Sequence, residues 1–516
     1  MITTPLSFHT KAKGQVIDLV SKLYISFDKE RAEGVFFTLD QSELNGTDRL
    51  STLDDNPMQL WDTYSYADFS DRLVSVSIER SIEFPYGTQC AMADFTLDNY
   101  DRYFDPANTL SPIAENNLPS RPTKIYAGYK GESPVQQFVG ITQQMPTING
   151  NGTISYHAID FLSDIAGQTL NDTIAMRNAR TDQVLVKIVE QFGLTSLQYD
   201  FEPAVNVIPF VFFDKGQNAG EAIQKLIQAE GGKFWLDEMG ILRFEKRKAT
   251  NVEPEITISE YDLISAEPSG ISDIVNRVKI SCELREVQEF QTVYSKTPSG
   301  DSTSNLWVIG AGQSIVRECR LEDPCYDVVN PTLGKNSGVS YFTAKNSEQQ
   351  EITSGIVASG ELSTNNYTIT FTNSNLFPVE IDEVRLWGEP AKVYDVLDYD
   401  AYEDTSVEKY GEHILEITDN TFFQSYEQAQ TYALYLLNER ANYNTTIKLQ
   451  VKGDFALQLG DAFELEGDYE GSYKIDAITW SLSNDSFVYT IKAHKFNPMQ
   501  FFTLDRSVLD GDDILG

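Results

Sequence analysis

The residues best suited to acid–base or nucleophilic chemistry are scarce in this sequence. It contains only four histidines, His9, His157, His413 and His494. A serine or cysteine nucleophile needs a base such as histidine beside it, and none of the four lies in a recognisable catalytic motif. The chain has no HExxH motif, no GxSxG elbow and no glycine-rich loop ending in GKS or GKT. His157 stands in an alternating run, Ser155–Ala158, that favours an ordinary strand residue.

The four cysteines do not form a metal-binding or redox pattern. Cys319 and Cys325 are separated by five residues, which fits neither a CxxC zinc pair nor a dithiol motif. Cys90 and Cys282 lie far from them and from each other. Four cysteines are also too few to cross-link a chain of this length, so we expect free and mostly buried thiols.

Carboxylates offer a weak calcium alternative. Asp98, Asp101 and Asp105 are close enough in sequence to bind one ion. Turn formation and N-capping are simpler explanations for the three aspartates. Residues 510–513, Asp-Gly-Asp-Asp, lack the rest of a calcium loop. Acidic residues are so abundant that some pair will reach glycosidase spacing by chance. The sequence therefore predicts no metal, cofactor or catalytic residues.

An aromatic cluster near residue 65 has two interpretations. Trp61, Tyr64, Tyr66 and Phe69 could stack on sugar rings, or they could pack against a neighbouring β domain. Packing is the simpler explanation, because aromatic side chains supply much of the buried area in β cores.

The elements that must position these residues belong to a large, acidic and mainly β protein. At 516 residues the chain should hold several domains, and 41% hydrophobic and 12% aromatic residues suffice for packed cores. The formal net charge of −37 disfavours binding to nucleic acid or anionic membranes. Such a surface either confers solubility or lines a conduit through which DNA passes without sticking.

The N-terminal region lacks the apolar core and cleavage site of a signal peptide. The most apolar run, Val207–Phe213, is too short to span a bilayer. We therefore expect synthesis in a cytosol, no membrane anchoring by this chain, and release, if any, as part of a larger particle.

Two stretches of the chain look like versions of one β module. Residues 138–161 and residues 445–496 each hold an apolar strand, a polar turn and a returning strand that ends in an aromatic residue. The early turn, Asn149–Gly152, consists of residues that tolerate positive φ, and Ser483–Asp485 could play the same part in the late copy. Two similar modules in one chain would let a few subunits build a ring of twice the apparent symmetry. This pattern favours assembly over catalysis.

Helices are few. One apolar stripe lies between a predicted N-cap at Thr181 and Gly193. A second, within residues 222–229, is stopped by two glycines and followed by a hairpin at 233–244. A third begins at Ser425 with Gln428 as a capping box. Residues 296–400 instead alternate and are rich in Ser, Thr, Asn and Gly, which predicts an inserted β-sandwich.

Four local signatures together resemble the tail hub proteins of bacteriophages and related injection machines, also called baseplate hub or tail-tip proteins. They are a strand followed by an Asn- and Asp-rich corner, a barrel signature, a helix followed by a hairpin, and an LGD segment before a YxI strand. In this chain they correspond to residues 91–106, residues 138–162, residues 220–247 with 273–278, and residues 459–475. The resemblance covers residues 70–290 and 425–496.

The resemblance implies a fold that is mainly β with α+β modules. It contains two tube-protein-like β-barrels, a helix-hairpin module and an inserted β-sandwich. The implied domains are an N-terminal extension (1–70), a first barrel (71–170), a helix-hairpin module (171–268), a second barrel with a helix (269–295 and 425–497), an inserted sandwich with an acidic linker (296–424) and an acidic tail (498–516).

The resemblance also implies a function in a virion tail tip, after synthesis in the cytoplasm of a bacterial host. Three copies would form a pseudo-sixfold ring between a sixfold tail and a threefold tip, in contact with a distal tail protein or tube ring, a tape-measure protein and tail fibre or receptor-binding proteins. DNA would pass only as cargo during ejection. Two alternatives remain: a hub whose insertion binds a host receptor, and a cell-wall hydrolase.

Overall fold

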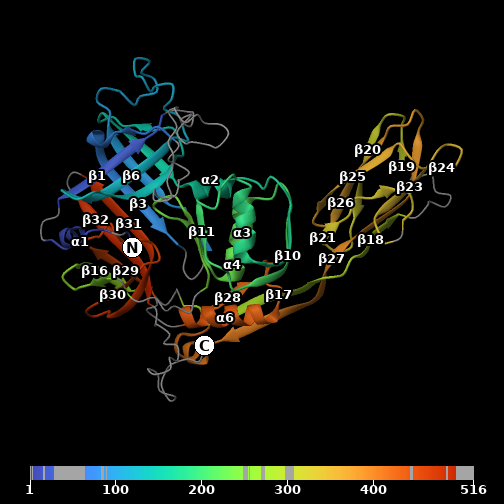
Figure 1. The fold of residues 1–516 in the computed structure, drawn as a ribbon. Helices are drawn as coiled ribbons and strands as arrows, with labels where there is room; N and C mark the ends of the chain where they lie inside the picture. Colours follow the sequence, from blue (N-terminus) through green and yellow to red (C-terminus); the bar gives the residue numbers. More distant parts are fainter. Residues whose placement is uncertain are drawn as a thin grey trace.

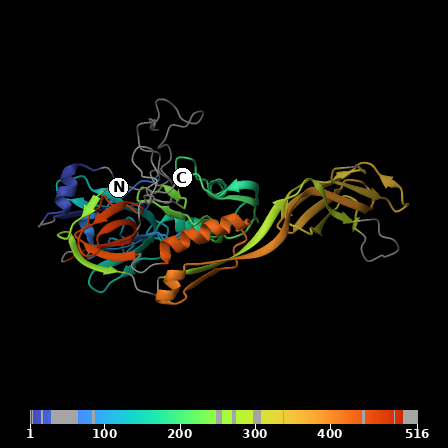
Figure 2. The same cartoon turned by 90° about the horizontal axis from the view of Figure 1, so that it is seen from below.

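The computed structural model describes residues 2, 4–14, 18–27, 64–82, 87–88, 90–247, 254, 256–268, 274–296, 307–336, 338–441, 446–483 and 486–495. Trp61, Asn484, Asp485, Phe496 and the predicted acidic tail with Asp510–Asp513 lie outside these ranges. The molecule is mainly β, as the sequence predicts. Figures 1 and 2 show two barrels side by side, an α+β module next to them and a sandwich at the end of a projecting arm.

The first barrel is built from strands that alternate between inward and outward residues. β5, for example, buries Ala93, Phe95 and Leu97, every second residue. Helix α1 (Leu6–Ala12) precedes the barrel, and a short 3-10 helix, η1 (Ser70–Arg72), lies between two of its strands. The barrel strands are β1 (Leu19–Ile25), β2 (Ala67–Asp68), β3 (Leu73–Ser81), β5 (Met92–Asp98), β6 (Pro122–Tyr129), β7 (Val135–Thr142), β8 (Thr147–Ile148) and β9 (Thr153–Ile159).

The predicted turn at Asn149–Gly152 connects β8 to β9. The amide of Asn149 donates to the carbonyl of Thr153 at 2.9 Å, and Gly152 has a φ of 80°, which glycine adopts without strain. This hairpin is confirmed. β1 pairs along its whole length with β6, so the N-terminal part of the chain is not only an extension but supplies a strand of the first barrel.

The second barrel repeats the strand order of the first. Its order is β16-β29-β32-β31-β30, and the first barrel runs β3-β5-β9-β7-β6. Its strands are β15 (Ile256–Ile258), β16 (Leu263–Pro268), β29 (Thr446–Val451), β30 (Ala462–Leu465), β31 (Gly471–Ser483) and β32 (Phe487–Lys495). A pairing of β3 with β31 unites both barrels in one 14-stranded sheet.

The α+β module lies between the barrels and the arm. The predicted helix and hairpin are present, and Gly231 ends the helix in the left-handed conformation at φ 70°. The predicted N-cap at Thr181 is displaced by one residue, because Arg180 occupies that position. The elements are β4 (Gly87–Thr88), α2 (Phe161–Gly167), β10 (Ile174–Arg180), α3 (Thr181–Glu190), β11 (Tyr199–Phe201), β12 (Val207–Phe213), α4 (Ala219–Glu230), β13 (Lys233–Leu236) and β14 (Leu242–Glu245).

A long two-stranded ribbon forms the base of the arm. β17 (Arg277–Val287) pairs antiparallel with the second half of β27 (Val379–Tyr402). β28 (Ile414–Ile417) pairs parallel with the other edge of β17. Helix α5 (Asp404–Tyr410) follows β27, and α6 (Tyr426–Arg440) covers one face of the ribbon (Figure 2). Ser425 caps α6 as predicted, accepting from the amide of Gln428 at 3.1 Å.

The arm corrects three parts of the sequence-based layout. Residues 269–295 do not complete the second barrel, because β17 pairs with β27 and β28, and β15 and β16 supply the missing strands instead. The supposed acidic linker at 393–404 is mostly strand β27. Helix α6 packs into the core of the α+β module through residues such as Tyr432. In each case alternation predicts a strand or a helix but does not say which partner it meets.

The end of the arm is a β-sandwich with its own hydrophobic core. Phe342, Ile369 and Phe371 are among its buried residues. Its strands, besides the first half of β27, are β18 (Gln291–Lys296), β19 (Trp307–Ile309), β20 (Ser314–Arg320), β21 (Cys325–Val328), β22 (Thr332–Leu333), β23 (Tyr341–Lys345), β24 (Glu351–Ile352), β25 (Ile356–Ser363) and β26 (Asn366–Asn373).

Candidate functional site: the barrel joint and the projecting arm

The joint between the barrels is a continuous antiparallel strand pair. β3 and β31 pair from Ser75 opposite Ser483 to Ser81 opposite Ala477. At its centre Ile78 lies opposite Trp480, and both side chains are fully buried. Backbone pairing and apolar burial together hold the barrels as one body, because neither edge is left for water to solvate.

A buried ion pair lies beneath this joint. Arg80 of β3 pairs with Glu238 from the turn between β13 and β14, with side chains 2% and 3% exposed. Gln458 donates to the same carboxylate at 3.0 Å, and Gln136 of β7 donates to the backbone carbonyl of Glu238 at 2.7 Å. Burial lowers the pKa of Arg80 to about 10. The pair ties both barrels to the hairpin of the α+β module.

A second buried charge cluster ties the second barrel to the same hairpin. Asp476 of β31 accepts from Lys233 of β13 at 3.1 Å and lies 2.7 Å from the Nδ1 atom of His494. Burial lowers the pKa of His494, so its imidazole is neutral at pH 7 and Lys233 carries the balancing charge. Nearby, Lys474 pairs with Glu245. The cluster is structural, since its members satisfy one another's charges.

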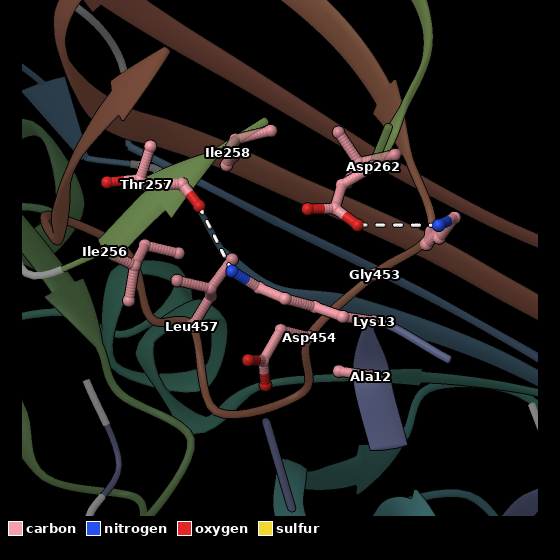
Figure 3. A pocket seen from close by; sticks show the side chains of 11 residues that line it. Ala12, Lys13, Ile256, Thr257, Ile258, Asp262, Gly453, Asp454 and Leu457 are labelled. Atoms are coloured by element: carbon pink, nitrogen blue, oxygen red, sulfur yellow. Dashed lines mark hydrogen bonds and ion pairs between the residues drawn. The ribbon is translucent and has the colours of Figure 1, made fainter. Parts of the chain in front are cut away.

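His9 takes part in an arrangement with the order of a catalytic relay. Its Nε2 atom lies 2.9 Å from the Thr4 hydroxyl, and its Nδ1 atom lies 2.6 Å from Asp454. The neighbouring cavity, shown in Figure 3, has a volume of about 40 Å³. Lys13 spans it by donating to the carbonyl of Thr257 at 3.3 Å. That space is too small for a substrate. The contacts of His9 with Asp454 and of Lys13 with Thr257 instead fasten α1 and the residue after it to the second barrel.

The remaining histidines lie apart from one another. His157 projects from β9 beside Asp94 of β5 at 2.7 Å. The Nε2 atom of His413 donates to the carbonyl of Tyr410 at 3.3 Å, and its backbone amide donates to the side chain of Asn276 at 2.7 Å. The structure therefore brings no two histidines to one site among the residues it describes. The four cysteines are free thiols, with Cys90 half-buried and the other three buried.

The aspartates of the corner segment serve the turn. Asp101 receives both guanidinium nitrogens of Arg72 at 2.9 and 2.8 Å, and Asp105 accepts from the amide of Ala107 at 2.8 Å. Asp98 accepts from the amide of Tyr100 at 3.1 Å. Within the described part of the chain no group of three or more potential metal ligands occurs.

The aromatic cluster near residue 65 packs in part against the first barrel. Phe69 lies edge-on to Phe104 at a ring distance of 5.1 Å and to Phe27 at 5.6 Å. The ammonium of Lys124 lies 4.9 Å from the centre of the Tyr66 ring, and Tyr64 packs against the α+β core. No helix in the described ranges is long and apolar enough to cross a membrane.

Contacts with the α+β module fix the direction of the arm. Arg177 of β10 pairs with Glu389 at 2.9 Å and lies over the ring of Tyr326. Asp214 accepts from the amide of Thr364 at 2.8 Å. These contacts lie at the near end of the sandwich, so its far end is left to project, as Figure 1 shows.

The far end of the sandwich displays an apolar loop on a rigid base. Buried Asn373 donates to the carbonyls of Gly310 and Phe377 at 3.1 and 2.9 Å. Asn375 donates to the carbonyl of Ser354 at 3.2 Å. Leu376, which directly follows Asn375, is 97% exposed. Because these bonds hold the backbone of the loop, binding through Leu376 costs less entropy than binding through an unrestrained loop.

Sequence reasoning missed the buried charges, although one signal marks Arg80. The alternation of β3 places Val76, Ile78 and Arg80 on the same inward face. A charged residue at an inward position indicates a buried partner. No comparable signal marks Glu238, which lies in a turn.

The fold is that of a mainly β protein built on a duplicated barrel. Solved structures similar to it include tail proteins and a component of a secretion system. The 43 kDa tail protein of a Shewanella oneidensis prophage has a TM-score of 0.45 and 9% identity over 84% of this chain and 95% of its own. A tail protein of Neisseria meningitidis has a TM-score of 0.46 and 9% identity over 83% and 93%. No family model matches the sequence, and no curated protein sequence matches it.

A third similar structure is an Escherichia coli protein described as a component of the type VI secretion system with structural similarity to T4 bacteriophage tail proteins. Its TM-score is 0.38 with 10% identity, over 83% of this chain and 74% of its own. These proteins belong to the class, phage tail and injection-machine components, that the sequence motifs resemble.

Proposed function

We propose that this chain is the structural hub of a phage or phage-like tail tip. Three copies form a pseudo-sixfold ring that joins a sixfold tail to a threefold tip and encloses the channel for the tape-measure protein and DNA. The observation that carries the proposal is the duplicated barrel. Two barrels of one strand order, joined edge to edge in a single chain, let three chains present six similar barrels to a sixfold neighbour.

Net charge supports the channel in this proposal. At −37 the chain repels phosphate groups, so DNA slides through such a ring as cargo without adhering to it. The barrels face the tail, where a distal tail protein or tube ring docks, and the arms carry the sandwiches away from the ring axis. The protein acts at the tail tip of the virion after synthesis in the bacterial cytoplasm.

The proposed role is non-enzymatic. Each histidine has a structural partner, and the relay at His9 adjoins a cavity of about 40 Å³. Purified protein should leave bacterial cell walls intact in a zymogram. A cleared band would establish the hydrolase alternative instead.

Electron microscopy of the purified chain tests the ring directly. Class averages should show threefold particles with six similar densities around a central opening, and light scattering should give three times the monomer mass. A chain that stays monomeric at high concentration and does not bind the neighbouring tail-ring protein would refute the hub.

A second candidate function rests on the exposed loop of the sandwich. Leu376 stands almost fully exposed on a rigid base, which suits insertion into an apolar pocket of a protein partner such as a tail fibre or a host receptor. The net charge of −37 of the chain disfavours an anionic lipid as the partner. Labelled protein should bind host cells or purified fibre, and Leu376→Ser should weaken that binding at least tenfold. Val205→Ser, at a 52% exposed site of the α+β module, is the matched control.

A further inference from the structure

The two barrels can be aligned residue by residue at the strand that forms the joint. The β3–β5 ladder shifts register between Leu73 and Ser75, and the β16–β29 ladder shifts at the same place, between Leu263 and Ser265. A bulge in both ladders makes β16 the equivalent of β3. Counting on from the bulge, Pro268 occupies the position of Ile78 in the first barrel.

The other strand of the joint can be aligned in the same way. β31 pairs with β32 so that Trp480 lies opposite Tyr489, and β8 pairs with β9 so that Ile148 lies opposite Ile154. Ile154 and Tyr489 occupy equivalent positions, because each stands four residues before a buried, inward-facing alanine of its strand. These alanines are Ala158 in β9 and Ala493 in β32. Ile148 in the first barrel is therefore the equivalent of Trp480 in the second.

Equivalent positions differ sharply in exposure. Trp480 and Ile78 are fully buried, because β31 of one barrel covers β3 of the other. Ile148 is 55% exposed, Pro268 is partly exposed, and the neighbouring Ile264 is 61% exposed. Within the described ranges β16 pairs only with β29, and β8 only with β9. The first barrel thus has a neighbouring barrel at β3 but not at β8. The second barrel has a neighbouring barrel at β31 but not at β16.

We propose that a second copy of this chain supplies that neighbour: β16 of one copy pairs antiparallel with the β8 edge of the next, with Pro268 opposite Ile148, as β3 pairs with β31. The contact joins two different edges, so it is heterologous and generates a closed ring when the rotation between copies closes. Joints within chains and joints between chains then alternate around the ring. This inference rests on the proposed hub function and names its subunit interface.

The charge distribution favours a second copy at these edges. In a chain of net charge −37, most surfaces repel their own kind. Residues 143–153 contain no charged side chain, and β16 contains one, Glu267. The joint within the chain is similar, since β3 and β31 meet through serines and apolar residues over most of their length. The two edges are therefore places where a second acidic chain can approach.

Disulfide cross-linking of the full chain tests the register. Directly opposed residues on antiparallel strands have Cβ atoms about 5 Å apart, within reach of a disulfide. Under mild oxidation the double variant Ile148→Cys/Pro268→Cys should give covalent dimers and trimers, and a mixture of the two single variants should give dimers only. Ile148→Cys/Ile264→Cys is the matched control, because four residues of strand displace the second thiol by about 13 Å. The wild-type protein, with its native thiols, gives the background level of cross-linking.

The outcomes separate this inference from the proposed function. A threefold particle whose Ile148→Cys/Pro268→Cys variant cross-links no better than the control would overturn the interface and leave the hub standing. A chain that is monomeric at every concentration would overturn both. As an independent measurement, Ile148→Asp should weaken assembly at least tenfold with an unchanged melting temperature, whereas Val205→Asp should leave assembly intact. Equal assembly of the two variants would also refute the interface.

Discussion

Replacing Arg80 by methionine tests whether the barrel joint depends on its buried ion pair. Arg80→Met leaves the carboxylate of Glu238, 3% exposed, without its guanidinium partner. Removing one member of a buried pair costs about 3–5 kcal/mol, because the remaining charge stays desolvated. For an unfolding unit of the size of the two barrels, that loss lowers the melting temperature by roughly 10 °C.

The assay is a double-mutant cycle in urea, followed by tryptophan fluorescence, to which Trp480 at the joint contributes. Arg80→Met/Glu238→Met should recover most of the lost stability, since two apolar side chains of similar size replace a desolvated pair at little cost. Lys187→Met, which removes an exposed ion pair with Glu190, is the control and should change stability by less than about 1 kcal/mol. A single variant as stable as this control, or a double variant no better than Arg80→Met, would refute the reasoning.

Three further predictions concern α6, α4 and α1. Burial raises the pKa of Glu439 to about 7, above its ordinary value of 4.5. The unfolded chain therefore releases this proton first, and wild-type stability should fall as pH rises from about 4.5 to 7. Glu439→Gln should remove up to about 3 kcal/mol of that fall in melts at pH 5 and pH 8, and an unchanged profile would contradict it. Gly231→Ala places a Cβ atom 2.8 Å from the Tyr432 ring at a residue with φ 70°. It should lower the free energy of unfolding in urea by about 2 kcal/mol. Gly150→Ala, with open space around it, is the control and should lower it by less than about 1 kcal/mol. His9→Ala should raise hydrogen exchange in α1 by roughly tenfold, since a lost hydrogen bond to a charged group costs about 1.5 kcal/mol; unaltered exchange would show that the relay does not fasten the helix.

Local patterns predicted the elements of this fold better than their partners. The turn at Asn149–Gly152 and the glycine stop at Gly231 follow from backbone conformations that few residues adopt, so the sequence is sufficient to place them. The partner of β17 is different. The alternating residues of β17 would fit the edge of any sheet. β17 becomes part of the arm because β27 extends beyond the sandwich and pairs with it.

The candidate site was partly predictable for the same reason. The duplication is visible as two similar strand-turn-strand segments, because each barrel must satisfy the same alternation. The charges that fix the barrels in place were not visible, because Glu238 and Asp476 are buried by elements distant in sequence. Their partners, Arg80 and Lys233, lie on strands of two different modules.

The position of the insertion makes the projecting arm compatible with the proposed ring. In the first barrel, residues 82–91 connect β3 to β5, and in the second barrel residues 269–445 make the equivalent connection from β16 to β29. A connection at the end of a hairpin can lengthen at small entropic cost, since closure grows only logarithmically with length. The inserted chain leaves and returns at the ends of two adjacent strands, so the β16–β29 ladder is undisturbed. The outer edge of β16 therefore keeps the geometry that β3 has at the joint, and an arm attached in this way does not obstruct closure of the proposed ring.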